Sequence, residues 1–218
     1  MIGDAPDRRV EILSDDDSLH ATWSRFGPLR RGANLHIHHR HSDFFYVLEG
    51  ELTVKLGPDG DETVAPVGTL VRIPPLVVHG FRNGSDAEVR YLNFHVPGQG
   101  FADYMRGLSD FDQDEPPADG GRPVSEAAIT SGGDVLCDVE EIAVAERRDG
   151  NDGAHVHHEH VESIYVLEGE LLVNDVRAAA GSWLQIPPGL PHAVSGSAHH
   201  LALHTPGFGL GARDQHPD

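Results

Sequence analysis

The stretch HIHHRHSDFFYVLEGE at residues 36–51 decides the fold, because it returns as HVHHEHVESIYVLEGE at residues 155–170. A second stretch, GTLVRIPPLVVH at residues 68–79, returns as GSWLQIPPGLPH at residues 181–192. The two pairs keep their order along the chain. Because self-similarity of this kind marks one structural unit that is present more than once, the sequence predicts two copies of a single fold.

Each copy consists of short apolar runs separated by Gly, Pro, Asn and Asp, which is typical of antiparallel β-hairpins. The helical spacing of Phe101, Tyr104, Met105 and Leu108 predicts one short helix after the first copy, with Gly107 weakening its end. We therefore expect an all-β chain. Its predicted parts are a first domain at residues 1–110 that includes the helix, an acidic linker at 111–134 and a second domain at 135–218. In the first copy the strands are expected at residues 19–26, 34–39, 44–48, 51–56, 69–73, 77–83 and 89–95.

The composition excludes several classes of partner. The chain has 35 acidic against 16 basic residues and a net charge of -19, so nucleic acid and anionic membranes are not expected to bind it. The single cysteine cannot form an intrachain disulfide, and no targeting segment or membrane span is visible, so we expect a cytoplasmic protein. Histidine is abundant, with 16 residues, which indicates metal or acid/base chemistry.

The repeated stretches supply the ligand types of a metal site. Side chains alternate along a strand, so His36 and His38 are expected to project to one side, and Asp43 follows after a short turn. The Pro-Pro stretch adds His79. Three neutral imidazoles and one carboxylate suit a divalent ion with open positions.

The second copy repeats this set with His155, His157, Glu162 and His192. Because aspartate is one methylene shorter than glutamate, occupancy of the first site is left open, and we expect one or two ions per chain. The mixed nitrogen and oxygen ligands suit Fe(II), Mn, Ni, Co or Zn.

These residues resemble the two motifs of the cupin superfamily. The first motif, His-x-His followed by Glu and Gly, is met by the second copy through Gly169, and the first copy departs from it by Asp43. The second motif, Pro-x-Gly followed by His and Asn, is met with Leu76 in place of Gly in the first copy and Gly196 in place of Asn in the second. The resemblance implies a bicupin, in which two double-stranded β-helix barrels form an internal pseudo-dimer, with a homodimer also open.

The segment VPGQGFADY at residues 96–104 is similar to the strand-to-helix exit of quercetin dioxygenase-like cupins. This resemblance implies a metal-dependent dioxygenase acting on a small oxygenated or phenolic compound, with Glu162 moving off the metal as a general base. Two alternatives stay open, because one fold hosts many activities. They are a non-catalytic metal or small-ligand binding protein and a metal-assisted isomerase or decarboxylase.

The remaining histidines fall into groups. His95 and His204 occupy matched positions in the closing strands, as partners of the ligands or as core residues. Solvent-facing positions are expected for the residues that flank the ligands and for those near the end of the chain: His39, His41, His158, His160, His199, His200 and His216.

Aromatic residues concentrate in the first copy. Phe44, Tyr46, Phe81 and Phe94 are expected either to pack its core or to line a pocket. The second copy combines the more regular ligand set with smaller neighbours, so we expect the substrate-accessible metal there.

Overall fold

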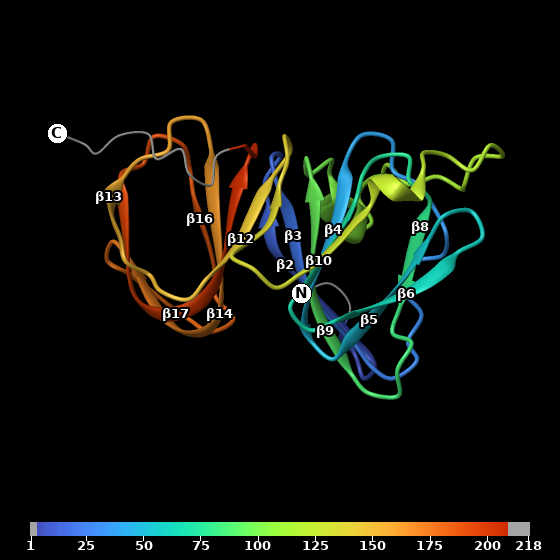
Figure 1. Ribbon diagram of the computed structural model, residues 1–218, viewed down its shortest axis with the longest axis horizontal. Coiled ribbons are helices and arrows are strands. Elements are labelled where there is room, and N and C mark those ends of the chain that lie inside the picture. The colour runs from blue at the N-terminus through green and yellow to red at the C-terminus, as the bar shows by residue number, and fades with distance from the viewer. Residues whose placement is uncertain (1–3, 209–218) are drawn as a thin grey trace. The chain divides into compact units, whose positions relative to one another are not determined.

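The computed structural model describes residues 4–208 and divides the chain into two compact units, Met1–Ser131 and Gly132–Asp218. Each unit is built from antiparallel strands that curl around a core of its own (Figure 1). The all-β prediction is confirmed. Among the described residues no helix is long and apolar enough to cross a membrane.

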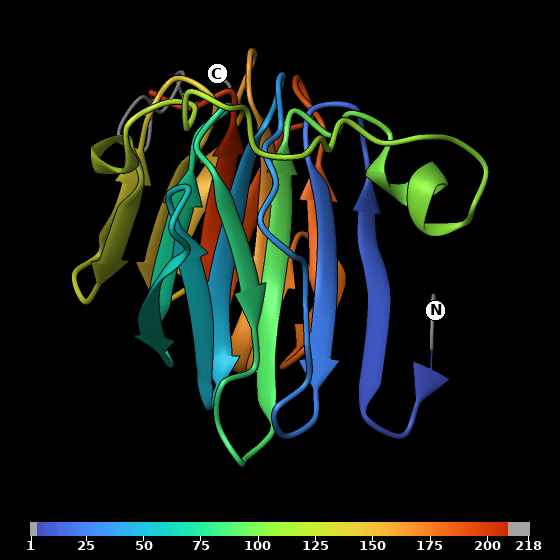
Figure 2. The ribbon, with the colours of Figure 1, turned by 90° about the vertical axis from the view of Figure 1, so that its right-hand side faces the viewer.

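The first unit contains a seven-stranded sheet in the order β1-β2-β3-β9-β4-β7-β10 and a three-stranded sheet in the order β6-β5-β8. Figure 2 shows these strands side by side, with the blue and green strands of the larger sheet in front. The strands are β1 (Asp4–Ala5), β2 (Arg8–Asp15), β3 (His20–Phe26), β4 (Ser42–Glu49), β5 (Glu51–Leu56), β6 (Asp61–Pro66), β7 (Thr69–Ile73), β8 (His79–Arg82), β9 (Val89–Val96) and β10 (Ala128–Ser131).

The second unit has one sheet in the order β11-β12-β17-β14-β15, with β13 pairing to β17 and β16 pairing to β14. Two long strands, β14 and β17, pair along most of their length. The strands are β11 (Val135–Asp138), β12 (Ala143–Arg147), β13 (Asp152–His155), β14 (Val161–Val173), β15 (Val176–Ala179), β16 (Trp183–Ile186) and β17 (His192–Thr205).

Alternation along β4 sorts the side chains of the first unit. Phe45 is fully buried in the core cluster that also holds Phe26 and Tyr91, and Asp43 lies on the same face of the strand because it is two residues away. Phe44 and Tyr46 therefore point to the opposite face, where Phe44 pairs with Phe94 across the sheet. Of the four aromatic residues expected to pack the core or line a pocket, Phe44, Tyr46 and Phe94 are buried on that face of the sheet, and Phe81 faces the interior and its cavity.

The repeated Glu-Gly-Glu sequence has a backbone reason in both units. Gly50 and Gly169 have φ values of 72° and 80°, in the left-handed region that favours glycine. A Cβ atom at Gly50 would lie 2.5 Å from the carbonyl oxygen of Glu88, and one at Gly169 would lie 2.4 Å from that of Ser197. Each glycine thus allows a left-handed backbone, directly after β4 in the first unit and within β14 in the second.

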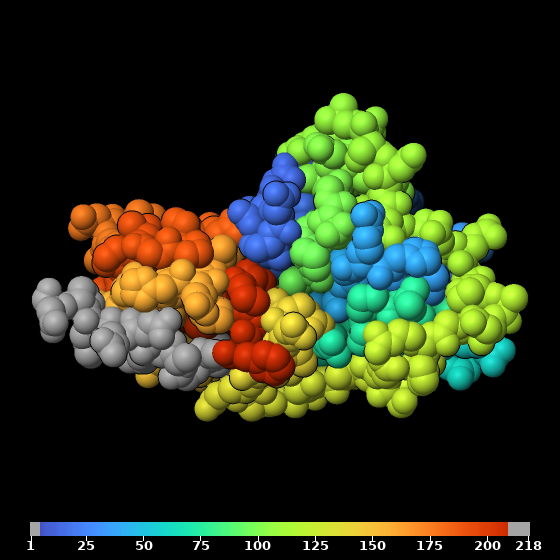
Figure 3. All heavy atoms as spheres, turned by 90° about the horizontal axis from the view of Figure 1, so that it is seen from above, coloured from blue at the N-terminus to red at the C-terminus, as the bar shows by residue number. Residues whose placement is uncertain are grey.

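The short helix α1 (Phe101–Met105) is shorter than the sequence predicts. The helix ends at Met105, and Gly107 adopts a φ of 74°. Leu108 therefore lies outside the helix and is exposed. Figure 3 shows the green segment around α1 standing out from the rest of the first unit.

The expected linker at 111–134 is largely part of the first unit. Asp114 pairs with Ile37 through backbone hydrogen bonds, the short 3-10 helix η1 (Val124–Glu126) follows, and β10 pairs with β7. The charged, proline-rich composition of this segment indicates a loop, but its backbone is held by pairing to strands that lie far away in sequence. We still propose the two-domain division expected from the repeat, with the boundary near Ser131.

Candidate metal centres

The structure brings the eight expected ligand residues together as two buried groups, one in each unit. In the first unit His36, His38, Asp43 and His79 each offer one ligand atom, and these atoms lie within 4.8 Å of one another. The same holds in the second unit for His155, His157, Glu162 and His192.

The segment that carries His36 and His38 is not a regular strand, although residues 34–39 were expected to form one. His36 instead pairs with His79 as an isolated bridge through two backbone hydrogen bonds of 2.8 and 2.9 Å. In the second unit His155 and His192 pair in the same way between β13 and β17. The candidate histidines do converge, as predicted. They are brought together by pairing between two segments, and not by lying on one continuous strand.

The Pro-Pro turns hold the backbone of the second histidine in each His-x-His sequence. The amide of Leu76 donates a 2.7 Å hydrogen bond to the carbonyl oxygen of His38, and the amide of Gly189 does the same to His157. Leu76 adopts a φ of 67° and Gly189 a φ of 79°, so the two turns have the same left-handed conformation. The substitution of leucine for glycine in the first copy therefore keeps the turn.

Five of the six candidate histidines are oriented by backbone carbonyl oxygens. The Nδ1 atoms of His36, His79, His155 and His192 donate to the carbonyl two residues earlier, at 2.7 to 3.0 Å, and that of His38 donates to Asp112 at 2.5 Å. Because a carbonyl oxygen can only accept, these rings carry their proton on Nδ1. Each Nε2 is left with a free lone pair, as in metal-binding histidines.

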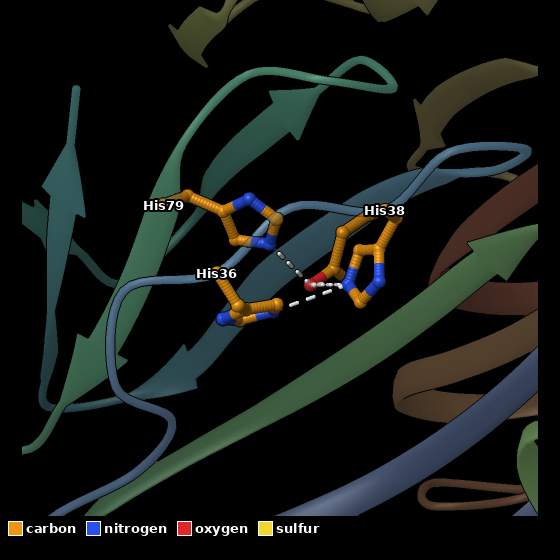
Figure 4. A group of neighbouring side chains, drawn as sticks. His36, His38 and His79 are labelled. Carbon is orange, nitrogen blue, oxygen red and sulfur yellow. Dashed lines mark hydrogen bonds and ion pairs between the residues drawn. The ribbon is translucent and has the colours of Figure 1, made fainter. Parts of the chain in front are cut away.

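The free nitrogens of the first unit aim at one point. Figure 4 shows the rings of His36, His38 and His79 turned toward one another. The Nε2 atoms of His36 and His38 are only 3.2 Å apart, although both are acceptors by the preceding argument. Two ligands at about 2.1 Å from an ion and at right angles lie about 3 Å apart, so a cation fits this pair.

Asp43 completes the first group, and a neighbouring side-chain amide positions its carboxylate. One oxygen of its carboxylate lies 3.4 Å from Nε2 of His79 and 3.9 Å from Nε2 of His38. The other oxygen accepts a hydrogen bond from the side-chain amide of Asn93, which also donates to the carbonyl of Phe44. Asn93 was not singled out from sequence, and its place in the second unit is taken by Ala202.

Glu162 lies closer to its histidines than Asp43 does. Its carboxylate is 2.7 Å from Nε2 of His192, 3.4 Å from that of His157 and 3.9 Å from that of His155. Burial alone would raise the pKa of Glu162, but hydrogen bonds from Nε2 of the surrounding histidines hold it well below its usual range. Without a metal these bonds require rings that are protonated on both nitrogens. Hydrogen bonding to Glu162 in turn raises the pKa of His155. A carboxylate that stays ionised suits a metal ligand.

In the first unit burial dominates the titration of the histidines. Removal from water lowers the pKa of His36 to about 4 and that of His38 further still. Neighbouring imidazoles add to both shifts. These rings are neutral near pH 7, which is the form that binds a metal.

Several histidines expected at the surface are buried. His41 and His160 lie inside their units, and His199 and His200 belong to β17, where His200 is buried and His199 contacts Glu146 at 3.1 Å. His39 and His158 are exposed, as expected. His216 lies outside the described residues. The error at His41 arises because residues 111 and 112, far along the chain, cover the turn.

His95 and His204 face the candidate carboxylates. Nε2 of His95 lies 3.5 Å from Asp43, directly opposite on β9, and Nε2 of His204 lies 3.8 Å from Glu162, directly opposite on β17. Of the two roles expected for these histidines, the structure therefore favours that of partners of the candidate ligands over that of core residues. Their matched repeat positions were the signal in the sequence.

A cavity of about 300 Å³ adjoins the first group. Its wall includes His36, His38 and Asp43, and it extends along an aromatic side formed by Phe26, Phe81, Phe101 and Tyr104 together with Met105. Arg8 and Arg31 also line it. The sequence favoured the second copy for access to substrate, whereas this cavity lies in the first.

Comparison with known proteins is consistent with this geometry. Residues 23–95 match the family model described as Cupin domain. Over 110 residues the chain is 30% identical to quercetin 2,3-dioxygenase of Bacillus subtilis (strain 168), a match that covers 50% of this chain and 32% of that protein. The chain thus spans about a third of the length of this curated relative.

Solved structures of cupin type share the fold across both units. Bacterial pirin YhhW of Escherichia coli, solved in complex with nickel(II), matches with a TM-score of 0.66 at 14% identity, covering 94% of this chain and 95% of that one. A variant of salicylate 1,2-dioxygenase from Pseudoaminobacter salicylatoxidans matches with a TM-score of 0.62 at 14% identity, covering 91% and 76%. Oxalate decarboxylase of Bacillus subtilis, studied for its Mn(II) centres, matches with a TM-score of 0.60 at 12% identity, covering 92% and 73%.

Proposed function

We propose that this chain, a member of the cupin superfamily, is a metal-dependent dioxygenase that acts on a small oxygenated or phenolic compound. The observation that carries the proposal is the cavity in the first unit, because candidate metal ligands and an aromatic wall line the same space. A pocket of about this size, in which convergent polar groups face an aromatic wall, can hold a small molecule.

The chain offers a complete ligand set for a divalent ion. His36, His38 and His79 present unprotonated Nε2 atoms, and Asp43 supplies the negative charge. A bound Fe(II), Mn, Ni, Co or Zn ion would supply Lewis-acid chemistry, and Fe or Mn also redox chemistry, at positions that the protein leaves open. Nickel is named for pirin and manganese for oxalate decarboxylase, which supports a divalent ion without choosing one.

Two arginines favour a substrate with an anionic group. Arg8 lies with its guanidinium 5.5 Å from the ring centre of Phe26, and Arg31 lines the same cavity. Within residues 4–208, no carboxylate forms an ion pair with either guanidinium, although the chain as a whole is strongly acidic. A phenolate or aromatic carboxylate would stack on the aromatic wall and place its charge toward these arginines.

The role expected for Glu162 stays a proposal for the second unit. Its carboxylate lies among four histidines and is ionised, which a general base requires, but the low pKa makes it a weak base while these histidines donate to it. The absence of nucleic-acid partners, a homodimer and the cytoplasmic location also remain predictions from the sequence.

Oxygen consumption by the full chain tests the proposal. The protein would be loaded in turn with Fe(II), Mn, Ni, Co and Zn and supplied with phenols, β-diketones and aromatic hydroxy acids. We expect uptake with one metal and loss of most of it in His79→Gln, while the matched His192→Gln variant keeps it. Loss only in His192→Gln would move the reaction to the second unit.

Absence of oxygen uptake with every metal and compound would contradict the proposal. Turnover without oxygen would then support an isomerase or decarboxylase, and tight binding without turnover a binding protein.

Arg31→Gln is expected to weaken the binding of an anionic aromatic compound by about tenfold or more while leaving its neutral methyl ester unaffected, because a hydrogen bond to a charged group contributes about 1.5–3 kcal/mol. Arg30→Gln is the matched control, since Arg30 pairs with Asp7 at the surface.

A further inference from the structure

The first unit contains more buried histidines than its candidate metal site needs. His41 and His95 lie beside His38, with ring centres 4.1 Å apart for His38 and His41 and 5.1 Å apart for His41 and His95. The three rings offer ligand atoms that all lie within 4.8 Å of one another. They therefore form a second group of metal-ligand type next to the first.

His41 has no hydrogen-bond partner for either ring nitrogen, although its side chain is fully buried. The carboxylate of Asp112 is 3.3 Å from its Nδ1 but lacks hydrogen-bond geometry. Nδ1 of His95 is also buried without a partner. A buried polar atom without a partner costs about 1–3 kcal/mol, so two such rings side by side call for an occupant that satisfies them.

The second unit shows that the fold does not require this arrangement. His160 occupies the position of His41, but its Nδ1 donates a 2.6 Å hydrogen bond to the carbonyl oxygen of Pro206. Its ring centre lies 6.4 Å from that of His157 and 6.0 Å from that of His204. His160 is thus satisfied by backbone and lies apart, whereas the rings of His157 and His204 are 4.8 Å apart and also have nitrogens without partners. Among the described residues the group of three histidine ligand atoms occurs in the first unit.

We propose that His38, His41 and His95 form a second position for a divalent cation in the first unit, which shares His38 with the position formed by His36, His38, Asp43 and His79. Nδ1 of His38 donates to the carbonyl of Asp112, so this ring has one free nitrogen. One nitrogen binds one cation. The two positions are therefore alternatives, and the first unit holds one ion at a time.

The two positions differ in charge and so in the ions they prefer. The first contains the carboxylate of Asp43, which suits Mn and Fe as well as Zn and Ni. The second offers three imidazole nitrogens and no carboxylate among its ligand atoms. Imidazole ligands without a carboxylate suit Cu, Ni and Zn. This inference concerns binding alone and does not depend on the proposed dioxygenase activity.

Nickel binding by the full chain tests the second position. In a background with His155→Gln and His192→Gln, which removes the site of the second unit, the first position is removed by His36→Gln and His79→Gln. We expect this chain still to bind one Ni²⁺ in calorimetry and elemental analysis. Adding His41→Gln should weaken binding by more than the about 10–100-fold that changes outside the ligand shell cause. The matched His39→Gln, at an exposed neighbour, should have no effect.

Failure of the chain to bind Ni²⁺, or binding that His41→Gln leaves unchanged, would overturn the proposal. Because the combined variant could fail to fold, a second experiment keeps all candidate ligands of the first unit. In the background lacking only the second-unit site, the electron paramagnetic resonance spectrum of one equivalent of Cu²⁺ should show two species, one of which disappears in His41→Gln. A single spectrum that is the same in both chains would equally overturn it.

Discussion

The two units place the same four ligand types around one point, but their surroundings differ. In the first, Asp43 is 3% exposed and is held by Asn93, with the rings of His41 and His95 close behind. In the second, Glu162 is 8% exposed and lies 2.7 Å from His192, and Ala202 stands where Asn93 would be. The shorter carboxylate of the first unit is thus accompanied by an amide that positions it, and its His41 packs closer to His38 than the matched His160 does to His157.

This difference shows how one ligand set serves two environments. The longer Glu162 side chain spans the site by itself, so its neighbours need not direct it. The shorter Asp43 side chain leaves room, and the first unit fills that room with polar side chains and a cavity lined by Arg8 and Arg31. We expect the two sites to differ in metal preference, in acid sensitivity and in access.

Removal of one ligand from each site should have the largest effect. His79→Gln and His192→Gln are each expected to lower the metal content of the chain by one ion, because the loss of an imidazole exceeds the about 10–100-fold affinity loss of outer-shell changes. Elemental analysis after dialysis against a weak chelator measures the content. If either variant kept the full metal content of the unmodified chain, the two groups could not both be metal sites.

Acid should destabilise the first unit before the second. In the metal-free protein His20 and His36 have a pKa of about 4 in the folded state because they are buried, against 6.5 when unfolded. Since the unfolded chain then binds more protons, stability falls as the pH decreases from 6.5 to 4, by up to about 3 kcal/mol for each group. In the second unit the raised pKa of His155 adds stability as the pH falls, which offsets the loss from His200, whose pKa burial lowers. The lowered pKa of Glu162 removes stability only once the pH falls below about 4.5.

One tryptophan in each unit makes this measurement specific. Trp23 lies in β3 and Trp183 in β16. Urea unfolding followed by fluorescence in Trp183→Phe reports the first unit, and in Trp23→Phe it reports the second. Equal shifts of both midpoints between pH 6.5 and 4 would contradict the prediction.

The carboxylates should show a smaller, graded effect. Glu162→Asp is expected to weaken metal binding at the second site by about tenfold, or about 1.4 kcal/mol, because no amide equivalent to Asn93 positions the shorter side chain. Asn93→Ala is expected to do the same at the first site by releasing Asp43. Competition with a chromogenic chelator measures both affinities, and an unchanged affinity in Asn93→Ala would mean that the amide does not position the ligand.

The smallest expected effect concerns the matched histidines His41 and His160 in the metal-free protein. His160→Gln should lower the free energy of unfolding by about 1 kcal/mol, because its hydrogen bond to the carbonyl of Pro206 is lost. His41→Gln removes a ring whose nitrogens make no hydrogen bond and should leave stability unchanged or raise it. Urea unfolding of both variants at pH 7.5 checks the sign. A larger loss for His41→Gln would show that the ring has a structural role.

The repeated stretches, by themselves, determined the all-β fold, the two copies and the candidate ligand residues that the structure brings together. Residue type and spacing are enough for this, because the bridge between His36 and His79 and its counterpart in the second unit need only the local geometry of two motifs. The matched positions of His95 and His204 likewise follow from the repeat.

Only the tertiary structure decided which histidines are buried and where the cavity lies. His41 is covered by Phe111 and Asp112, whose backbone also orients His38, and these residues lie in a segment whose composition indicates an exposed linker. The wall of the cavity joins Arg8, Phe81 and Tyr104, which are far apart in sequence. Burial depends on which distant segments pack together, and local composition and periodicity do not contain that information.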